Sequence, residues 1–354
     1  MTGVNAEAEF GNRLSGEFGA ERTEIDEPTS GSTFSRYVLT KAGGSLISLL
    51  IVVLLGFFAF RILPGNPVAQ MTHGRIVTAR QIEEIRRQLG LDKPWYLQFF
   101  VYAKGLINGH LGTSFTYGRS VSSLIGQFIG PTLLLTGTSA VIAILLGLWL
   151  GEKAAWLRDR FFDRVHTGIA IVLWSAPTFW LGLLLLLVFG GELQILPTGG
   201  MTTTGADYNG LRHILDVAEH LVLPVTTLVA VSYAQFMLVM RASLLEEMSS
   251  DYLVTARAKG VKERDIRRRH ASPNALLPAV TLIFLQLGGL IAGAVTVETV
   301  FSWPGLGFLT YQALSGPDLP LLQGTFVVFS SIIILTNFLA DIAYRFLDPR
   351  VRAA

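Results

Sequence analysis

Apolar residues occur in six long runs, and polar residues are concentrated between these runs. A helix needs about 20 apolar residues to cross the hydrocarbon core of a bilayer, and each run is long enough to do so. Five runs contain no Asp, Glu, Lys or Arg, and the sixth contains only Asp341, near its end. The pattern predicts an all-α integral membrane protein with six transmembrane helices. The predicted spans cover residues 42–60, 131–151, 165–189, 221–240, 275–297 and 319–343.

Two features inside these runs predict local geometry. Gly147 and Gly151 form a small-xxx-small pair, which lets two helices approach each other closely,. Pro177 lies inside the third run, where it removes a helical hydrogen bond and should kink the helix,.

The segments outside the spans differ in character. Residues 1–35 lack apolar periodicity and are predicted to form a disordered cytoplasmic tail, followed by a transmembrane domain over residues 36–354,. Within the external segment 61–130, residues 78–89 have helical spacing of apolar positions,. Residues 94–105 are rich enough in aromatic side chains to lie along the membrane interface,.

The distribution of Lys and Arg predicts the orientation of the chain. Segments 1–41, 152–164, 241–274 and 344–354 together carry 19 of these residues, whereas loops 190–220 and 298–318 carry one and none. Short cytoplasmic loops are enriched in Lys and Arg. The segment 61–130 carries eight, but long loops escape this rule,. We therefore expect both termini and the segment 241–274 in the cytoplasm.

The overall composition agrees with a membrane protein. Hydrophobic residues make up 51% of the chain and charged residues only 15%, whereas a soluble domain carries about 25% charged residues. The net charge of +2 is too small to indicate a nucleic-acid partner,. The chain has no cysteine, which excludes disulfides, thiolate catalysis and cysteine metal sites,.

The sequence contains none of the catalytic patterns that it would need to do chemistry itself. It has no Gly-Lys pair and therefore no Walker A loop to hold ATP phosphates,. HExxH and GxSxG are also missing, and the six histidines are scattered singly without the spacing of metal ligands,. We expect no catalytic residue, no metal and no cofactor on this chain.

The basic segment 251–278 is the densest polar stretch between two apolar runs. Asp251 can cap a short helix, and Gly260 can end that helix in a left-handed turn. A second helical stretch follows over residues 262–269, with Glu263 and Arg267 at i,i+4, and Pro273 closes the segment,. These signals predict a docking surface outside the bilayer.

This segment resembles the cytoplasmic signature loop of importer-type ABC transporter permeases. Thr255 stands where glutamate is often found, as is common in the peptide-transport branch of that family. The residues that match the pattern are Thr255, Ala256, Arg257, Gly260, Ile266, Leu277 and Pro278.

Other motifs are similar to the dipeptide, oligopeptide and nickel permeases of that family. Asn66 and His110 depart from them, because both stand where the family usually has aspartate. The resemblance covers about residues 36–352. The matching motifs lie at residues 63–67, 89–94, 109–114, 298–307 and 348–352.

The resemblance implies a type I ABC importer permease fold in the plasma membrane of a bacterium. It also implies a second homologous permease subunit, two cytoplasmic ATPase subunits or domains that bind ATP and Mg, an extracytoplasmic solute-binding protein, and contact with membrane lipid. The helix before Gly260 would couple to the ATPases, since the chain must borrow its energy from a partner. The expected ATPase-coupling residues are Asp251, Tyr252, Thr255, Ala256, Arg257, Ala258, Gly260 and Ile266. The triplet 267–269 either joins that contact or anchors the chain to anionic lipid,.

The loop 298–318 is apolar although it is expected to face the outer side. We predict a re-entrant gate at the outer mouth, where irregular backbone must be buried in protein or line water. The alternative is a simple connecting loop with Trp303 as an interfacial anchor. The expected gate residues are Phe301, Trp303, Pro304, Gly305 and Gly307.

Other classes of function fit the sequence less well. An integral enzyme would need an intramembrane catalytic group, which the sequence lacks. An assembly scaffold would have no coupling loop, and a passive channel would not need the loop that contains Gly260. Spans nearly free of charge suit varied peptides rather than one fixed ionic ligand,. A nickel chelate or another small solute remains the alternative cargo.

Overall fold

The structure is a computed structural model, and it describes residues 30–62, 78–88 and 92–347. Most of the predicted tail and the motifs at 63–67 and 348–352, together with positions 89–91 of a third motif, lie outside the described residues. The chain divides into two compact units, Met1–Lys41 and Ala42–Ala354. Every contact discussed below lies within the second unit.

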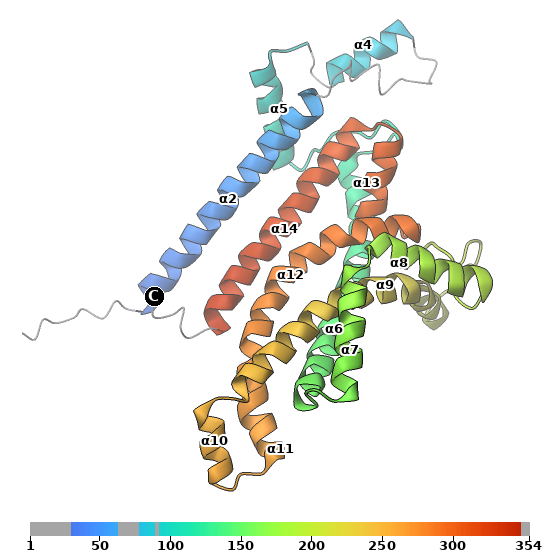
Figure 1. Cartoon of the computed structure of the whole chain (residues 1–354). Helices are drawn as coiled ribbons and strands as arrows, with labels where there is room; N and C mark the ends of the chain where they lie inside the picture. Colours follow the sequence, from blue (N-terminus) through green and yellow to red (C-terminus); the bar gives the residue numbers. More distant parts are fainter. Residues whose placement is uncertain (1–29, 63–77, 89–91, 348–354) are drawn as a thin grey trace, which may run out of the picture. The chain divides into compact units, whose positions relative to one another are not determined.

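The described residues are mostly helical (Figure 1). In this part of the chain there is also one isolated β-bridge, between Thr113 and Ser120. The two π-helical segments of the described residues are labelled η. The helices are α2 (Ser30–Ile62), α4 (Ala79–Gln88), α5 (Trp95–Ile107), α6 (Val121–Trp156), α7 (Phe161–Ser175), α8 (Thr178–Leu185), η1 (Leu186–Glu192), α9 (Leu211–Glu247), α10 (Asp251–Ala258), α11 (Glu263–Asp265), η2 (Ile266–Ala271), α12 (Ser272–Val300), α13 (Leu306–Ser315) and α14 (Leu319–Leu347).

Most predicted spans coincide with single long helices. Within the described residues, four helices are long and apolar enough to cross a membrane: Phe34–Ala59, Val121–Trp156, Leu211–Glu247 and Leu319–Ala343. The bent pair formed by α7 with α8 and η1 makes a fifth span if it crosses as one. The run 275–297 lies in α12, a helix of 29 residues. A count of six spans stays a prediction.

The third predicted span is broken rather than kinked. Helix α7 ends at Ser175, α8 starts at Thr178, and the two segments are bent by 105°. Ala176 has an extended backbone with ψ 134°, as expected before a proline, whose ring disfavours helical geometry in the preceding residue,. Pro177 therefore starts a new helix instead of bending a continuous one.

Close packing of α6 against α9 forms the main core. A side chain on Gly147 would overlap the backbone of Tyr233, and one on Gly151 would overlap the backbone of Met237. The predicted small-xxx-small contact is thus confirmed. Around this contact lies a cluster of buried apolar side chains that also includes Phe301 and Trp303, from the segment between α12 and α13.

Candidate functional site

The segment that follows α9 folds into a helical hairpin (Figure 1). Helix α10 is ended by Gly260, whose φ of +77° is left-handed, as predicted,. The turn is closed by hydrogen bonds from Gly260 N to Arg257 O (2.9 Å) and from Val261 N to Ala256 O (3.2 Å). The predicted cap is wrong by one position. Ser250 is the N-cap, without a side-chain capping bond, and Asp251 is the first helical residue.

Apolar side chains fix the hairpin to the ends of α6, α9 and α12. Leu253 of α10 and Ile266 of η2 are both fully buried, and they pack with Leu244, Ala271 and Ala275. Because side chains in such a cluster are close-packed, the hairpin and the helix ends form one rigid piece. Ile266, expected among the ATPase-coupling residues, is an internal anchor of the hairpin in this structure.

Polar contacts add to this attachment. The Tyr252 hydroxyl donates to Glu247 of α9 and accepts from Asn274 Nδ2 of α12 (2.9 Å). Burial, and to a lesser degree the bond to Glu247, raises the pKa of Tyr252, so the hydroxyl keeps the proton that it donates,. Tyr252 thereby joins the two helices between which the hairpin lies.

The predicted pair of Glu263 with Arg267 does not form. Arg267 Nε lies 3.0 Å from a Glu152 carboxylate oxygen at the end of α6, and Ser272 Oγ donates to the same oxygen over 2.8 Å. Glu263 instead pairs with Arg257 at 2.8 Å. The π-helical turn η2 starts at Ile266 and changes the angular spacing of side chains, which directs Arg267 towards α6,. Glu152 was missed because it lies far from the hairpin in the sequence.

The outer face of the hairpin is open. Among the expected coupling residues, Asp251, Tyr252, Thr255, Ala258 and Gly260 are exposed, whereas Ala256 and Arg257 are half-buried. The exposed Val254, which sequence reasoning missed, adds an apolar side chain to this surface at 56% exposure. Nothing lies within 4 Å of the position that a Gly260 side chain would take, so the tip can be approached closely.

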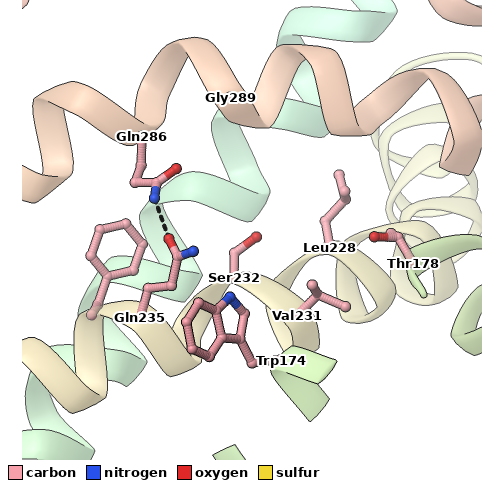
Figure 2. A pocket seen from close by; sticks show the side chains of 9 residues that line it. Trp174, Thr178, Leu228, Val231, Ser232, Gln235, Gln286 and Gly289 are labelled. Atoms are coloured by element: carbon pink, nitrogen blue, oxygen red, sulfur yellow. Dashed lines mark hydrogen bonds between the residues drawn. The ribbon is translucent and has the colours of Figure 1, made fainter. Parts of the chain in front are cut away.

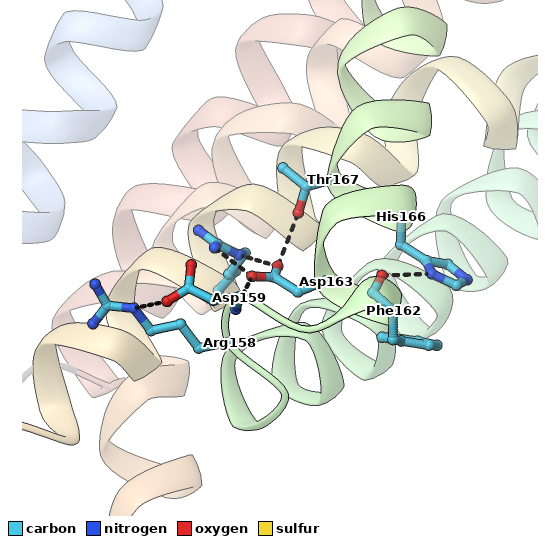
Figure 3. A network of polar contacts seen from close by, with 7 residues as sticks. Arg158, Asp159, Phe162, Asp163, His166 and Thr167 are labelled. Carbon is cyan, nitrogen blue, oxygen red and sulfur yellow. Dashed lines mark hydrogen bonds and ion pairs between the residues drawn. The ribbon is translucent and has the colours of Figure 1, made fainter.

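An ion pair near the same helix ends joins α7 to α9. Asp163 is buried and accepts from Arg241 Nε (2.6 Å) and from its terminal nitrogen (2.8 Å). The backbone N–H of Asp159 and the hydroxyl of Thr167 complete the surroundings of this carboxylate, which lies at the centre of the network in Figure 3. Such a bidentate contact sets both the distance and the orientation of the two helices.

The segment between α12 and α13, expected to form a gate, is buried. Phe301, Trp303 and Leu306 have at most 1% exposure, and Gly305 and Gly307 are buried as well. Trp303 donates its indole N–H to the backbone oxygen of Pro131 (3.0 Å). Trp303 is therefore a core residue rather than an interfacial anchor, and Pro304 is half-buried beside it.

Glu298 holds this segment in place. Its carboxylate accepts from Thr132 Oγ1 (2.7 Å), from Gly307 N (2.6 Å) and from Phe308 N (3.1 Å). Side chains on Gly305 or Gly307 would overlap Glu298, which explains the two glycines at this turn. We name residues 298–307 with their contacts to α6 the outer joint. The sequence motif contained Glu298, but only the fold shows that it caps α13.

A similar carboxylate positions the loop before α6. Asp318 is fully buried and accepts from Ser114 Oγ (2.6 Å) and from Thr116 N (2.9 Å). The motif at 109–114 is thereby tied to the start of α14. Among the described residues, no three potential metal-ligating side chains come together.

Comparisons with known proteins agree with these features. Residues 143–353 match the family described as binding-protein-dependent transport system inner membrane component, and residues 34–133 match the N-terminal family of such membrane components. A protein named a peptide permease in Brucella suis biovar 1 (strain 1330) is 37% identical over 319 residues, covering 90% of this chain and 99% of the relative. The glutathione transport system permease protein GsiC of Escherichia coli O6:H1 is 39% identical over 316 residues, covering 89% and 98%.

A solved structure has the same fold. The structure of the MetNI methionine ABC transporter in inward-facing conformations matches 64% of this chain and 96% of its own chain, with a TM-score of 0.50 and 19% sequence identity. At this identity the likeness concerns the arrangement of helices alone.

Proposed function

The chain belongs to the family of inner membrane components of binding-protein-dependent transport systems, and on this premise we propose that it forms half of an ATP-driven import pathway for peptides. The permease identity and the type I ABC importer fold predicted from the sequence are confirmed. The chain is a transport subunit of the bacterial inner membrane, and ATP hydrolysis belongs to its partner subunits.

The observation that carries the peptide assignment is the likeness along almost the whole chain to permeases named for peptides and for glutathione, at 37% and 39% identity. Spans nearly free of ionisable groups support it, since such a pathway does not select one fixed charge,. The alternative cargo is nickel as a chelate rather than as the free ion, because no three potential metal-ligating side chains come together in the described spans.

Uptake measurements test this assignment. Cells that lack the chain should lose accumulation of labelled di- and oligopeptides and should regain it when the gene is restored, while nickel uptake stays unchanged. Loss of nickel uptake with normal peptide uptake would contradict the proposal.

We infer that the working complex contains a second related permease subunit, two ATPase subunits or domains that bind ATP and Mg, and an extracytoplasmic solute-binding protein. We also infer that both termini face the cytoplasm, on the charge distribution described above,. This places the hairpin on the side of the ATPases. Copurification of the chain with an ATPase subunit tests the assembly, and a scaffold or channel would purify without one.

The exposed face of α10 is proposed as the surface on which the ATPases push. Small residues at Ala258 and Gly260 let a partner approach closely, and the buried Leu253 transmits displacement to the ends of α9 and α12. A rigid lever of this kind shifts the balance between outward- and inward-facing states.

The outer joint is proposed to open and close the outer mouth. Leu306→Cys introduces the chain's only thiol at a fully buried position. A membrane-impermeant thiol reagent should label it only when ATP is trapped on the complex. Leu314→Cys, on the same helix at 68% exposure, is the control that should label in both states. Equal labelling of Leu306→Cys in both states would leave the joint as a connecting loop.

A further inference from the structure

A cavity of about 180 Å³ lies between the broken helix pair α7–α8 and the helices α9 and α12 (Figure 2). Gln235 of α9 and Gln286 of α12 point towards each other across it, with Ser232 and Trp174 beside them and Thr178 at its other end. Gln235 and Gln286 both fall inside the apolar runs predicted to span the membrane. Polar side chains at this depth are commonly functional.

The polar groups of the cavity are only partly satisfied. Gln286 Nε2 donates to Gln235 Oε1. Among the described residues, no further hydrogen bond joins Gln235 Nε2, Gln286 Oε1 or the Ser232 hydroxyl, and these side chains are only half-buried. A polar group without a partner in an apolar environment is costly, so these atoms must meet water or a ligand in the cavity.

The chemistry of these groups matches a peptide bond. Each glutamine amide offers both a donor and an acceptor, as each backbone amide does. No ionised side chain lines the cavity, and the surrounding predicted spans carry none near the cavity. The cavity therefore neither attracts nor repels a charged side chain of the cargo. Trp174, at 49% exposure, presents an aromatic surface for apolar cargo side chains,.

We propose that this cavity is a peptide-binding station of the translocation pathway, in which Gln235 and Gln286 bind backbone amides of the cargo irrespective of its charge. The inference rests on the proposed peptide function. A pocket that encloses a small molecule usually has about 300–1,000 Å³. The cavity, at about 180 Å³, is smaller than that. It therefore forms one side of the binding station, and the second permease subunit forms the other side.

A charge introduced at Gln235 or Gln286 should make uptake depend on the charge of the peptide, whereas uptake by the native chain should not. Uptake of two tripeptides that differ only in a central Lys or Glu is measured at pH 8 with the complete transporter. Gln286→Glu and Gln235→Glu should shift the uptake ratio about tenfold towards the Lys peptide, and Gln286→Lys should shift it towards the Glu peptide, because opposite charges attract and like charges repel at close range. The solute-binding protein is the same in every variant, so a shifted ratio belongs to the permease.

Gln323→Glu is the matched control. It makes the same isosteric change in α14, and Gln323 is a half-buried residue that does not line the cavity. This variant should leave the ratio unchanged. The isosteric glutamate variants carry the test if the lysine variant fails to reach the membrane. An unchanged ratio in both glutamate variants, or an equal shift in the control, would overturn the proposal.

Thiol reactivity provides a second measurement that does not depend on charge selection. Because the chain has no cysteine, Gln286→Cys and its neighbour Leu285→Cys each create a single site at nearly the same depth. Leu285 is 63% exposed and does not line the cavity. A small hydrophilic thiol reagent should label position 286 at least tenfold faster, and peptide with binding protein should slow that labelling. Equal, unprotected labelling of both would contradict the station.

These results separate the inference from the proposed function. Failure of the native complex to take up any peptide would refute the function itself. Normal peptide uptake with an unmoved ratio and no protection would refute only the station.

Discussion

At the scale of single residues, two positions have backbone or bonding requirements that few other residues meet. Gly260 adopts a φ of +77° at the tip of the hairpin, where side-chain-bearing residues are strained,. Glu298 is a buried carboxylate that accepts three hydrogen bonds, two of them from the backbone N–H groups of Gly307 and Phe308 at the start of α13. One position lies on the proposed ATPase contact and the other in the outer joint, so their substitution should have different consequences.

Gly260→Val should abolish transport while membrane insertion stays intact. The β-branched side chain is strained by about 1–3 kcal/mol at this φ and also blocks close approach of the ATPase,. Peptide uptake and the amount of chain in the membrane are measured together. Gly205→Val is the control, because Gly205 has a φ of +80° and equally open surroundings in another loop. Normal uptake by Gly260→Val would refute the coupling contact.

Glu298→Ala should destabilise the folded chain. The backbone N–H groups of Gly307 and Phe308 would lose their acceptor, and each unsatisfied buried group costs about 1–3 kcal/mol,. The Thr132 hydroxyl would keep only its long bond to the Phe128 carbonyl (3.4 Å). Thermal unfolding of the purified complex should show a clearly lower midpoint. The exposed Glu219→Ala in α9 should leave the midpoint unchanged. A native midpoint for Glu298→Ala would show that the outer joint does not depend on this carboxylate.

At the scale of helices, close contacts between α6 and α9 decide how the hairpin is supported. The same two helices carry Glu152 and Arg241, whose ion pairs hold the hairpin and α7 respectively. A substitution that shifts α6 relative to α9 would therefore displace the hairpin even where the substituted residue does not contact the hairpin.

Gly151→Val should reduce both stability and transport. The new side chain would overlap the Met237 carbonyl and the Met240 side chain, and such overpacking costs about 1–3 kcal/mol,. Gly137→Val is a matched control on the same helix, since Gly137 is exposed and has no atom within 4 Å of the added carbon. Unfolding midpoints and uptake of the two variants are compared. Equal behaviour of both would exclude a tight α6–α9 contact.

At the scale of the whole molecule, the first unit and the remainder are expected to contribute differently. Residues 1–35 precede the main part of the family match, and 30–35 already belong to α2. Deleting residues 1–35 behind a new initiator methionine should leave uptake unchanged, because no predicted span or motif is removed. Uptake and membrane content of the shortened chain are the measurement. Complete loss of uptake at normal membrane content would make the tail an essential element.

The sequence by itself determined the features that depend on neighbouring residues. Uninterrupted apolar runs specify long helices, because every backbone polar group in a bilayer must be satisfied within the helix. The left-handed turn at Gly260 likewise follows from the conformational preference of one residue, and the helix at Ala79–Gln88 follows from the helical spacing of its apolar positions. At Pro177 the sequence predicted a change of direction, but as a kink rather than the break that the structure has. The signature motifs also identified the permease family before any geometry was considered.

Only the tertiary structure decided which distant residues meet. The partner of Arg267 is Glu152 because η2 turns that side chain towards α6, and no i,i+4 rule contains this information. Other contacts also join segments that lie far apart in the sequence. Trp303 bonds to Pro131, Glu298 bonds to Thr132, and Gln286 bonds to Gln235. Local preferences act over a few residues, whereas these contacts depend on how the helices pack, and packing is set by the shapes of all the side chains at once.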